Sequence, residues 1–213
     1  MKKRKITPYP EIRASLNTLD LIVCEHKKLP WRWIGHTACV YRNEVGQLMV
    51  FESTRHGGVQ LSPMGLWVAE YPGHVGVRRM IYGTEDFTKI FDRFDEVDYF
   101  IYKHLGTSYP DLKTAKGLLY LIRAAWDSDI FKKASTNVDN DDWIFCTDLY
   151  MRLLKAVGLV GKWVTTSEWE PDDMWKSIEM GEISLTEVSS FSAIDFYLGV
   201  VGKASLGEVV WIK

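Results

Sequence analysis

Two strand-like runs that flank a tight turn constrain the fold of this chain more than any other feature. Residues 36–42 and 47–53 are rich in Thr, Val, Tyr and Phe, which are residue types that favour strands. The segment between them, Asn43 to Gly46, has the sequence Asn-Glu-Val-Gly, which is typical of turns. The pattern therefore predicts a β-hairpin.

The register of this hairpin decides which side chains share a face of the sheet. If Gly46 closes a three- or five-residue loop with a bulge, residues of the two strands lie opposite one another on one face. The opposed pairs are then Val40 with Leu48, Ala38 with Val50, and His36 with Glu52. Directly opposed residues have Cβ atoms about 4.5 to 5.5 Å apart, so Glu52 can reach the imidazole and fix which ring nitrogen carries the proton. A two- or four-residue loop would instead put Glu52 on the other face.

Strands dominate the first part of the chain and helices the second. Further strands are expected at 19–25, 59–61, 75–82 and 208–212. The helical periodicity predicts one or two helices between 84 and 101, and others at 114–131, 144–157 and 172–180. This order favours an α+β fold. We expect a single domain over residues 1–213, with residues 1–14 as an N-terminal extension.

The composition is that of an ordinary soluble domain, and it excludes several classes of function. The 213 residues are 46% apolar and 25% charged, with a formal net charge of -2, so the chain has no basic field for a nucleic-acid partner. Three cysteines without a CxxC pair predict neither a disulfide framework nor a zinc knuckle, and they fit a reducing compartment. The basic N-terminus lacks the apolar run of a signal peptide, and no stretch approaches the roughly 20 apolar residues of a membrane span.

Cys146 lies where the predicted helix at 144–157 begins. A helix N-terminus offers partial positive charge and free backbone N–H groups, which lower the pKa of a thiol and can hold an oxyanion. Three acidic neighbours, Asp141, Asp142 and Asp148, would raise that pKa, so a reactive thiol needs His36 as an ion-pair partner. A cysteine in an apolar helix is more often a buried small hydrophobe, and spacing alone does not bring Cys146 to the hairpin.

Several segments match a known family in order along the chain. They are Ile-Gly-His-Thr-Ala-Cys-Val-Tyr-Arg at 34–42, Val-Phe-Glu-Ser at 50–53, Gly-Val-Gln-Leu-Ser-Pro at 58–63, Ile-Phe-Cys-Thr-Asp-Leu at 144–149 and Ala-Val-Gly-Leu at 156–159. Leu-Asp-Leu-Ile at 19–22 is similar to the entry strand of the family, and the segment 105–111 is similar to its Gly-x-x-Tyr-Asp motif. On these segments the chain resembles the permuted NlpC/P60 family, and in particular its YiiX-like members.

The resemblance implies a fold and a triad. The fold would be a circularly permuted papain-like α+β domain, with an antiparallel sheet or partial barrel packed against helices and with the histidine strand before the cysteine helix. The triad would be Cys146 as nucleophile, His36 as base and Glu52 as the residue that orients the base. Two segments depart from the family pattern: Cys-Thr-Asp at 146–148 replaces Cys-Ser-Glu, and Leu-Asp-Leu at 19–21 replaces Gly-Asp-Leu.

Other residues compete for the site or could line it. His74, in Gly-His-Val-Gly-Val, is locally closer to the unpermuted family pattern than His36 is, but it has no acid across a plausible hairpin. We prefer His36 and keep His74 as the alternative base. His56, Tyr109 and Trp33 are candidate substrate-binding residues. No cofactor is expected, because His36 and Cys146 supply two metal ligands at most.

The expected activity is hydrolysis of an amide bond, in a peptide or an acyl-amide, through an acyl-enzyme. Peptidoglycan stem peptides are one substrate class that the resemblance suggests. Two alternatives stay open: a lipid-directed thiol acyltransferase or thioesterase, and a non-catalytic binding or virion module with the same fold. Without a signal peptide, we expect the protein in the cytoplasm or in a virion.

Overall fold

A computed structural model of the chain describes residues 5–25, 34–82, 94–109, 144–159, 183–184 and 204–213. The predicted helices at 114–131 and 172–180 lie outside these ranges, as does the predicted helix start at Thr84. Among the described residues no helix has the length and apolar character that crossing a bilayer requires.

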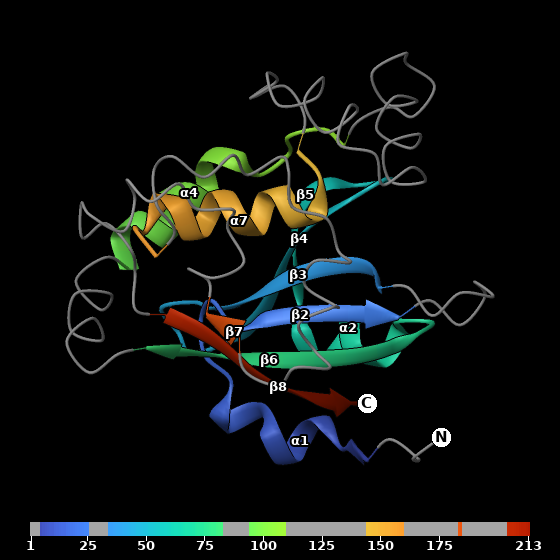
Figure 1. Cartoon of the computed structure of the whole chain (residues 1–213). Helices are drawn as coiled ribbons and strands as arrows, with labels where there is room; N and C mark the ends of the chain where they lie inside the picture. The colour runs from blue at the N-terminus through green and yellow to red at the C-terminus, as the bar shows by residue number, and fades with distance from the viewer. Residues whose placement is uncertain (1–4, 26–33, 83–93, 110–143, 160–182, 185–203) are drawn as a thin grey trace, which may run out of the picture.

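A mixed β-sheet forms the centre of the molecule (Figure 1). Its strands are β1 (Ile6–Thr7), β2 (Leu21–Glu25), β3 (Ile34–Arg42), β4 (Leu48–Thr54), β5 (Gly58–Pro63), β6 (His74–Tyr82), β7 (Ile183–Ser184) and β8 (Ala204–Ile212). The order across the sheet is β1-β8-β6-β2-β3-β4-β5, and β7 pairs with β8 off this path. Only β1 and β8 pair in parallel among the described strands. The predicted α+β class is confirmed, and the sheet is open and mixed rather than purely antiparallel.

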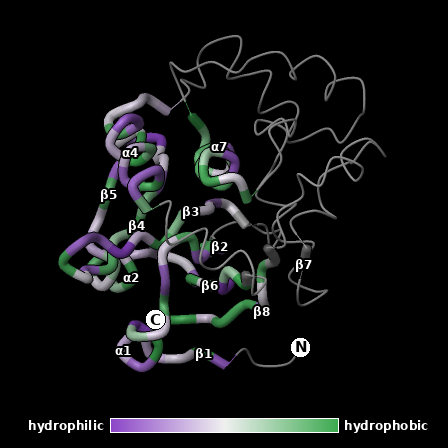
Figure 2. Tube along the Cα trace, turned by 90° about the vertical axis from the view of Figure 1, so that its left-hand side faces the viewer, coloured by the Kyte–Doolittle hydropathy of each residue, from purple (hydrophilic) through white to green (hydrophobic). Residues whose placement is uncertain are grey.

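Helices pack on both faces of this sheet. Alternate residues of each strand point to opposite faces, and the buried residues accordingly form two clusters. One face packs against α4 (Phe94–His104) and α7 (Cys146–Ala156), which lie side by side (Figure 1, Figure 2). The other packs against α2 (Met64–Glu70) and the short α1 (Tyr9–Ile12). Residues that the sequence assigns to an N-terminal extension thus contribute β1 and α1 to this fold.

Helix α7 confirms the helix predicted at 144–157. Its apolar positions recur with the helical period and are buried against the sheet. It ends before Gly158, whose φ of 75° is the left-handed conformation in which glycine commonly stops a helix. Helix α2 was not predicted, because its sequence lies between prolines and glycines that favour a loop.

The β3–β4 hairpin forms, but its predicted register is wrong by two residues. Val40 pairs with Val50, not Leu48. Asn43 and Gln47 form the last pair before the loop, and the Asn43 N–H donates to the Gln47 carbonyl at 3.0 Å. The loop between them has three residues and ends in a bulge at Gly46, whose φ is 78°. A two-residue shift keeps every side chain on its predicted face. His36 and Glu52 therefore still share a face, although they lie diagonally rather than directly opposite.

Strands β3 and β4 separate at the end of the hairpin that carries His36 and Glu52. Their pairing ends at Cys39 and Phe51, whereas β3 stays paired with β2 as far as Ile34 and β4 stays paired with β5 as far as Thr54. Figure 1 shows β4 and β5 turning away from β3. We call this opening the β3–β4 gap. It allows groups from the two faces of the sheet to meet.

Asp20 holds the start of β2 against β6. Its fully buried carboxylate accepts hydrogen bonds from the backbone N–H groups of Asn17 and Met80, both at 2.8 Å, and lies 3.3 Å from Nε of Arg79. Two backbone donors of separate segments thus depend on one side chain.

We expect Asp20→Ala to lower the free energy of unfolding by about 2 to 4 kcal/mol, because it leaves two backbone donors without their buried acceptor. Urea unfolding followed by circular dichroism measures the change, with Glu44→Ala on the exposed hairpin loop as the control. Equal stability of the two variants would contradict this role for Asp20.

Candidate active site

Cys146 is the first residue of α7, at the mouth of the β3–β4 gap. Its neighbour Phe145 has extended backbone, and no side chain caps the helix. The segment that leads into α7 is held by Ser53 of β4, whose hydroxyl donates to the Ile144 carbonyl at 2.6 Å. Cys146 is buried, with 6% of its surface exposed. The thiol therefore lies at an uncapped helix N-terminus, next to the ends of two strands.

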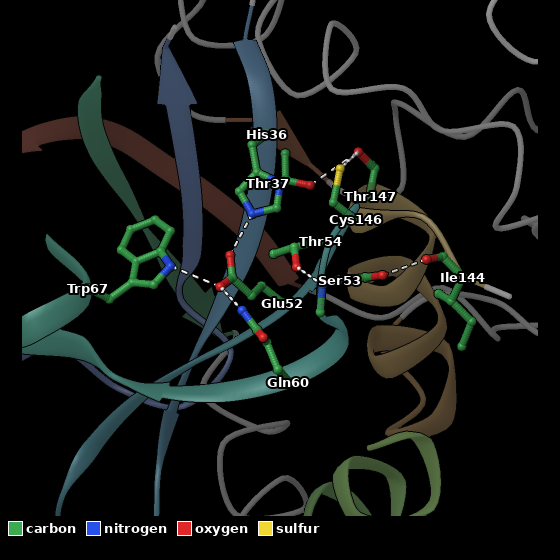
Figure 3. Close-up of polar contacts among 11 residues, drawn as sticks. His36, Thr37, Glu52, Ser53, Thr54, Gln60, Trp67, Ile144, Cys146 and Thr147 are labelled. Carbon is green, nitrogen blue, oxygen red and sulfur yellow. Dashed lines mark hydrogen bonds and ion pairs between the residues drawn. The ribbon is translucent and has the colours of Figure 1, made fainter. Parts of the chain in front are cut away.

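His36 and Glu52 form a hydrogen-bonded ion pair on the opposite side of the gap (Figure 3). Nε2 of His36 lies 2.7 Å from Oε2 of Glu52. The second carboxylate oxygen accepts hydrogen bonds from Nε2 of Gln60 at 2.9 Å and from Nε1 of Trp67 at 3.0 Å. Burial alone would raise the pKa of Glu52, but the hydrogen bond and charge of His36, with the two further donors, lower it. Glu52 is therefore ionised and fixed in orientation.

Cys146 and His36 shift each other's pKa in the directions that favour an ion pair. Burial would lower the pKa of His36, but hydrogen bonds with Cys146 and Glu52, and their negative charge, raise it to about 10. Burial would raise the pKa of Cys146, but the hydrogen bond and charge of His36, together with hydrogen bonds from Thr37, lower it to about 7. Because Glu52 occupies Nε2, Nδ1 is the ring nitrogen left for the sulfur. The arrangement favours thiolate and imidazolium near neutral pH.

The negative charge of Asp148 is neutralised by an ion pair and so has little effect on the thiol. Its carboxylate is held by Arg152, one helical turn further along α7, with Nε 3.0 Å from Oδ1 and Nη2 3.0 Å from Oδ2. This ion pair offsets the unfavourable effect that the sequence predicts for Asp148. The two other acidic neighbours, Asp141 and Asp142, lie outside the described residues.

His74, the alternative base, lies in a different part of the sheet. It belongs to β6 and pairs with Glu25 of β2, so a whole strand separates it from β3. Its ring packs edge-on against Trp211 with 6.4 Å between centroids. The structure brings His36, and not His74, to Cys146.

The three candidate substrate-binding residues have different positions. Tyr109 is half-buried, and its ring packs edge-on against Phe145, beside the thiol, with 5.3 Å between centroids. Burial raises the pKa of Tyr109, and the negative charge of Cys146 adds to this effect. His56 is exposed in the turn between β4 and β5. Trp33 lies outside the described residues.

The sequence does not predict two side-chain contacts of Glu52, which come from Gln60 and Trp67. Gln60 is the cross-strand partner of Glu52 in β5, a position that only the β4–β5 register reveals. Trp67 lies on α2, stacks against Tyr71 and donates its indole N–H to Glu52. Its role is polar because α2 packs on the same face of the sheet as Glu52.

Comparison with protein-family models and with curated proteins finds no match to this chain. In the ranges that the structure describes, no three His, Cys, Asp or Glu side chains lie close enough together to hold a metal ion.

The shifted pKa of Cys146 has a measurable consequence. Burial raises the pKa of Cys24 and of Cys39, so both stay protonated at neutral pH. We expect iodoacetamide at mildly acidic pH to label Cys146 well ahead of the other two, with a midpoint near pH 7, because the thiolate is the nucleophile. Mass spectrometry of digests across a pH series measures the labelling. Equal labelling of the three thiols, or a midpoint near 9, would count against the ion pair.

Glu52→Gln should move that midpoint upward from about 7 towards the ordinary thiol value of 9, because the imidazolium loses its buried counter-charge and holds its proton less firmly. Trp67→Phe is the matched variant, since it removes one donor to Glu52 and keeps the charge. We expect a smaller shift for it than for Glu52→Gln. Identical midpoints for Glu52→Gln and the unchanged protein would refute the role of Glu52.

Proposed function

We propose that this protein is a cysteine hydrolase that cleaves an amide bond through an acyl-enzyme. The observation that carries the proposal is the hydrogen bond of the His36 imidazole to the buried Glu52 carboxylate, next to a Cys146 thiol whose pKa the same imidazole lowers. A nucleophile, a base and a group that orients the base are the minimum set for this chemistry. Cys146, His36 and Glu52 supply all three of these groups.

The reaction follows from the charges of the site. The Cys146 thiolate attacks the carbonyl carbon, and the oxyanion that forms accepts a hydrogen bond from the Cys146 backbone N–H at the helix N-terminus. The His36 imidazolium donates its proton to the leaving amine, and the carbon–nitrogen bond breaks. Water, deprotonated by His36, then attacks the acyl-enzyme and releases the acid, and the thiolate and the imidazolium are restored. Glu52 keeps the ring in one tautomer and orientation throughout.

The fold supports assignment to a permuted papain-like class. The histidine strand β3 precedes the cysteine helix α7 in the chain, which is the permuted order. Leu19 stands where the similar family has glycine, and its φ of 75° is the left-handed conformation that glycine adopts readily. The backbone at this position is therefore one that a glycine would also adopt without strain. Peptides and acyl-amides, including peptidoglycan stem peptides, are the substrates that this class suggests.

The direct test is hydrolysis of a panel of stem peptides and fatty-acyl amides by the purified full chain. We expect Cys146→Ala and His36→Ala to lose at least about 10⁴-fold in rate, with circular dichroism to show that both variants fold. The unchanged protein should also gain the mass of the acyl group when it is quenched during turnover. Full activity of Cys146→Ala would overturn the mechanism. Transfer of the acyl group to an added amine, without hydrolysis, would instead identify an acyltransferase.

A further inference from the structure

The β3–β4 gap places polar groups of Thr37 and Thr147 around the sulfur of Cys146. Thr37, of β3, is fully buried, and 1% of the surface of Thr147, of α7, is exposed. Their hydroxyl oxygens lie 3.1 Å apart, and the Thr147 oxygen lies 3.9 Å from the Cys146 sulfur. Figure 3 shows both threonines beside the thiol. The thiol therefore has polar partners besides His36.

The separation of the strands supplies a backbone donor as well. Backbone N–H and C=O groups of an antiparallel strand point alternately to its two neighbours. Those of Val40 bond to Leu19 and Asp20, on the β2 side, so those of Thr37, an odd number of residues away, point to the β4 side. The ladder with β4 has already ended there. The Thr37 N–H is accordingly directed into the gap towards the Cys146 sulfur, where it helps to lower the pKa of the thiol.

The two hydroxyl groups carry two protons, and the hydrogen bond between them uses only one. Whichever hydroxyl donates to the other, the second proton stays available, and the sulfur is the acceptor that both oxygens face. A thiolate accepts such hydrogen bonds more strongly than a neutral thiol does. Threonine also holds its hydroxyl in fewer rotamers than serine, because the side chain is β-branched.

We propose that Thr37 and Thr147 are positioning residues that hold the Cys146 sulfur as a thiolate facing His36. The Thr37 N–H and the hydroxyl pair form a cradle of hydrogen-bond donors around the sulfur. This inference rests on the proposed function of Cys146, and it adds a second set of groups that keeps the nucleophile ionised and in place.

The test is the pH dependence of Cys146 alkylation by iodoacetamide in the full chain. We expect Thr37→Val, which removes the hydroxyl and keeps the shape, to raise the midpoint by about one pKa unit and so to slow alkylation about fivefold at pH 7 and about tenfold at acidic pH, where the thiolate is the minor form. Thr37→Ser should restore the rate to within about twofold, since it restores the donor. Thr7→Val on β1, far from the gap, is the matched control and should leave the midpoint unchanged. A merely structural role for Thr37 would not move the midpoint.

A second variant keeps the test decisive if Thr37→Val does not fold. Thr147→Val removes the other hydroxyl from α7 and should raise the midpoint in the same direction. An unchanged midpoint in the folded threonine variants would overturn the cradle while leaving the triad intact. A midpoint near 9 in the unchanged protein would instead remove the proposed function itself. The two failures are therefore distinguishable.

Discussion

The candidate site depends on the point at which β3 and β4 stop bonding to each other. Up to Cys39 and Phe51 the two strands form a continuous ladder, and the faces of the sheet are separated by it. Beyond that pair the backbone no longer divides the faces. The base and its carboxylate come from the α2 face, the nucleophile comes from the α7 face, and the two sets of groups meet across the opening (Figure 3). A continuous ladder would keep them apart.

Burial of charge in this opening is tolerated because each charge is compensated. Glu52 has 3% of its side chain exposed and His36 has 14%, and a buried charge without a partner would cost several kcal/mol. Every oxygen of the carboxylate accepts a hydrogen bond, and the imidazole lies between the carboxylate and the sulfur. Three groups therefore share two negative charges and one positive charge, and the donors from Gln60 and Trp67 offset the excess. Loss of any one donor would leave part of this charge uncompensated.

The sequence predicts the strands and the helix that carry the site residues, but it does not predict that Cys146 lies next to His36 and Glu52. Period-two alternation placed His36 and Glu52 on one face, and helical periodicity placed Cys146 at a helix start. The register was missed because a shift of two residues leaves the alternation unchanged, and only the exact position of the loop distinguishes the two. The β3–β4 gap and the contact from Trp67 arise from packing between segments distant in sequence, for which single-sequence patterns carry no signal.

The pairing of β8 with both β6 and β1 has a consequence for the order in which the protein folds. The hairpin β3–β4 and its neighbour β5 are contiguous in sequence, so they can form early and locally. Strand β6, in contrast, lacks its outer partner until residues 204–212 have been synthesised. Until then its edge presents unpaired backbone groups, which are a template for pairing with other chains. During synthesis the edge of β6 is therefore open to pairing with other chains, and a chaperone would protect it until β8 is made.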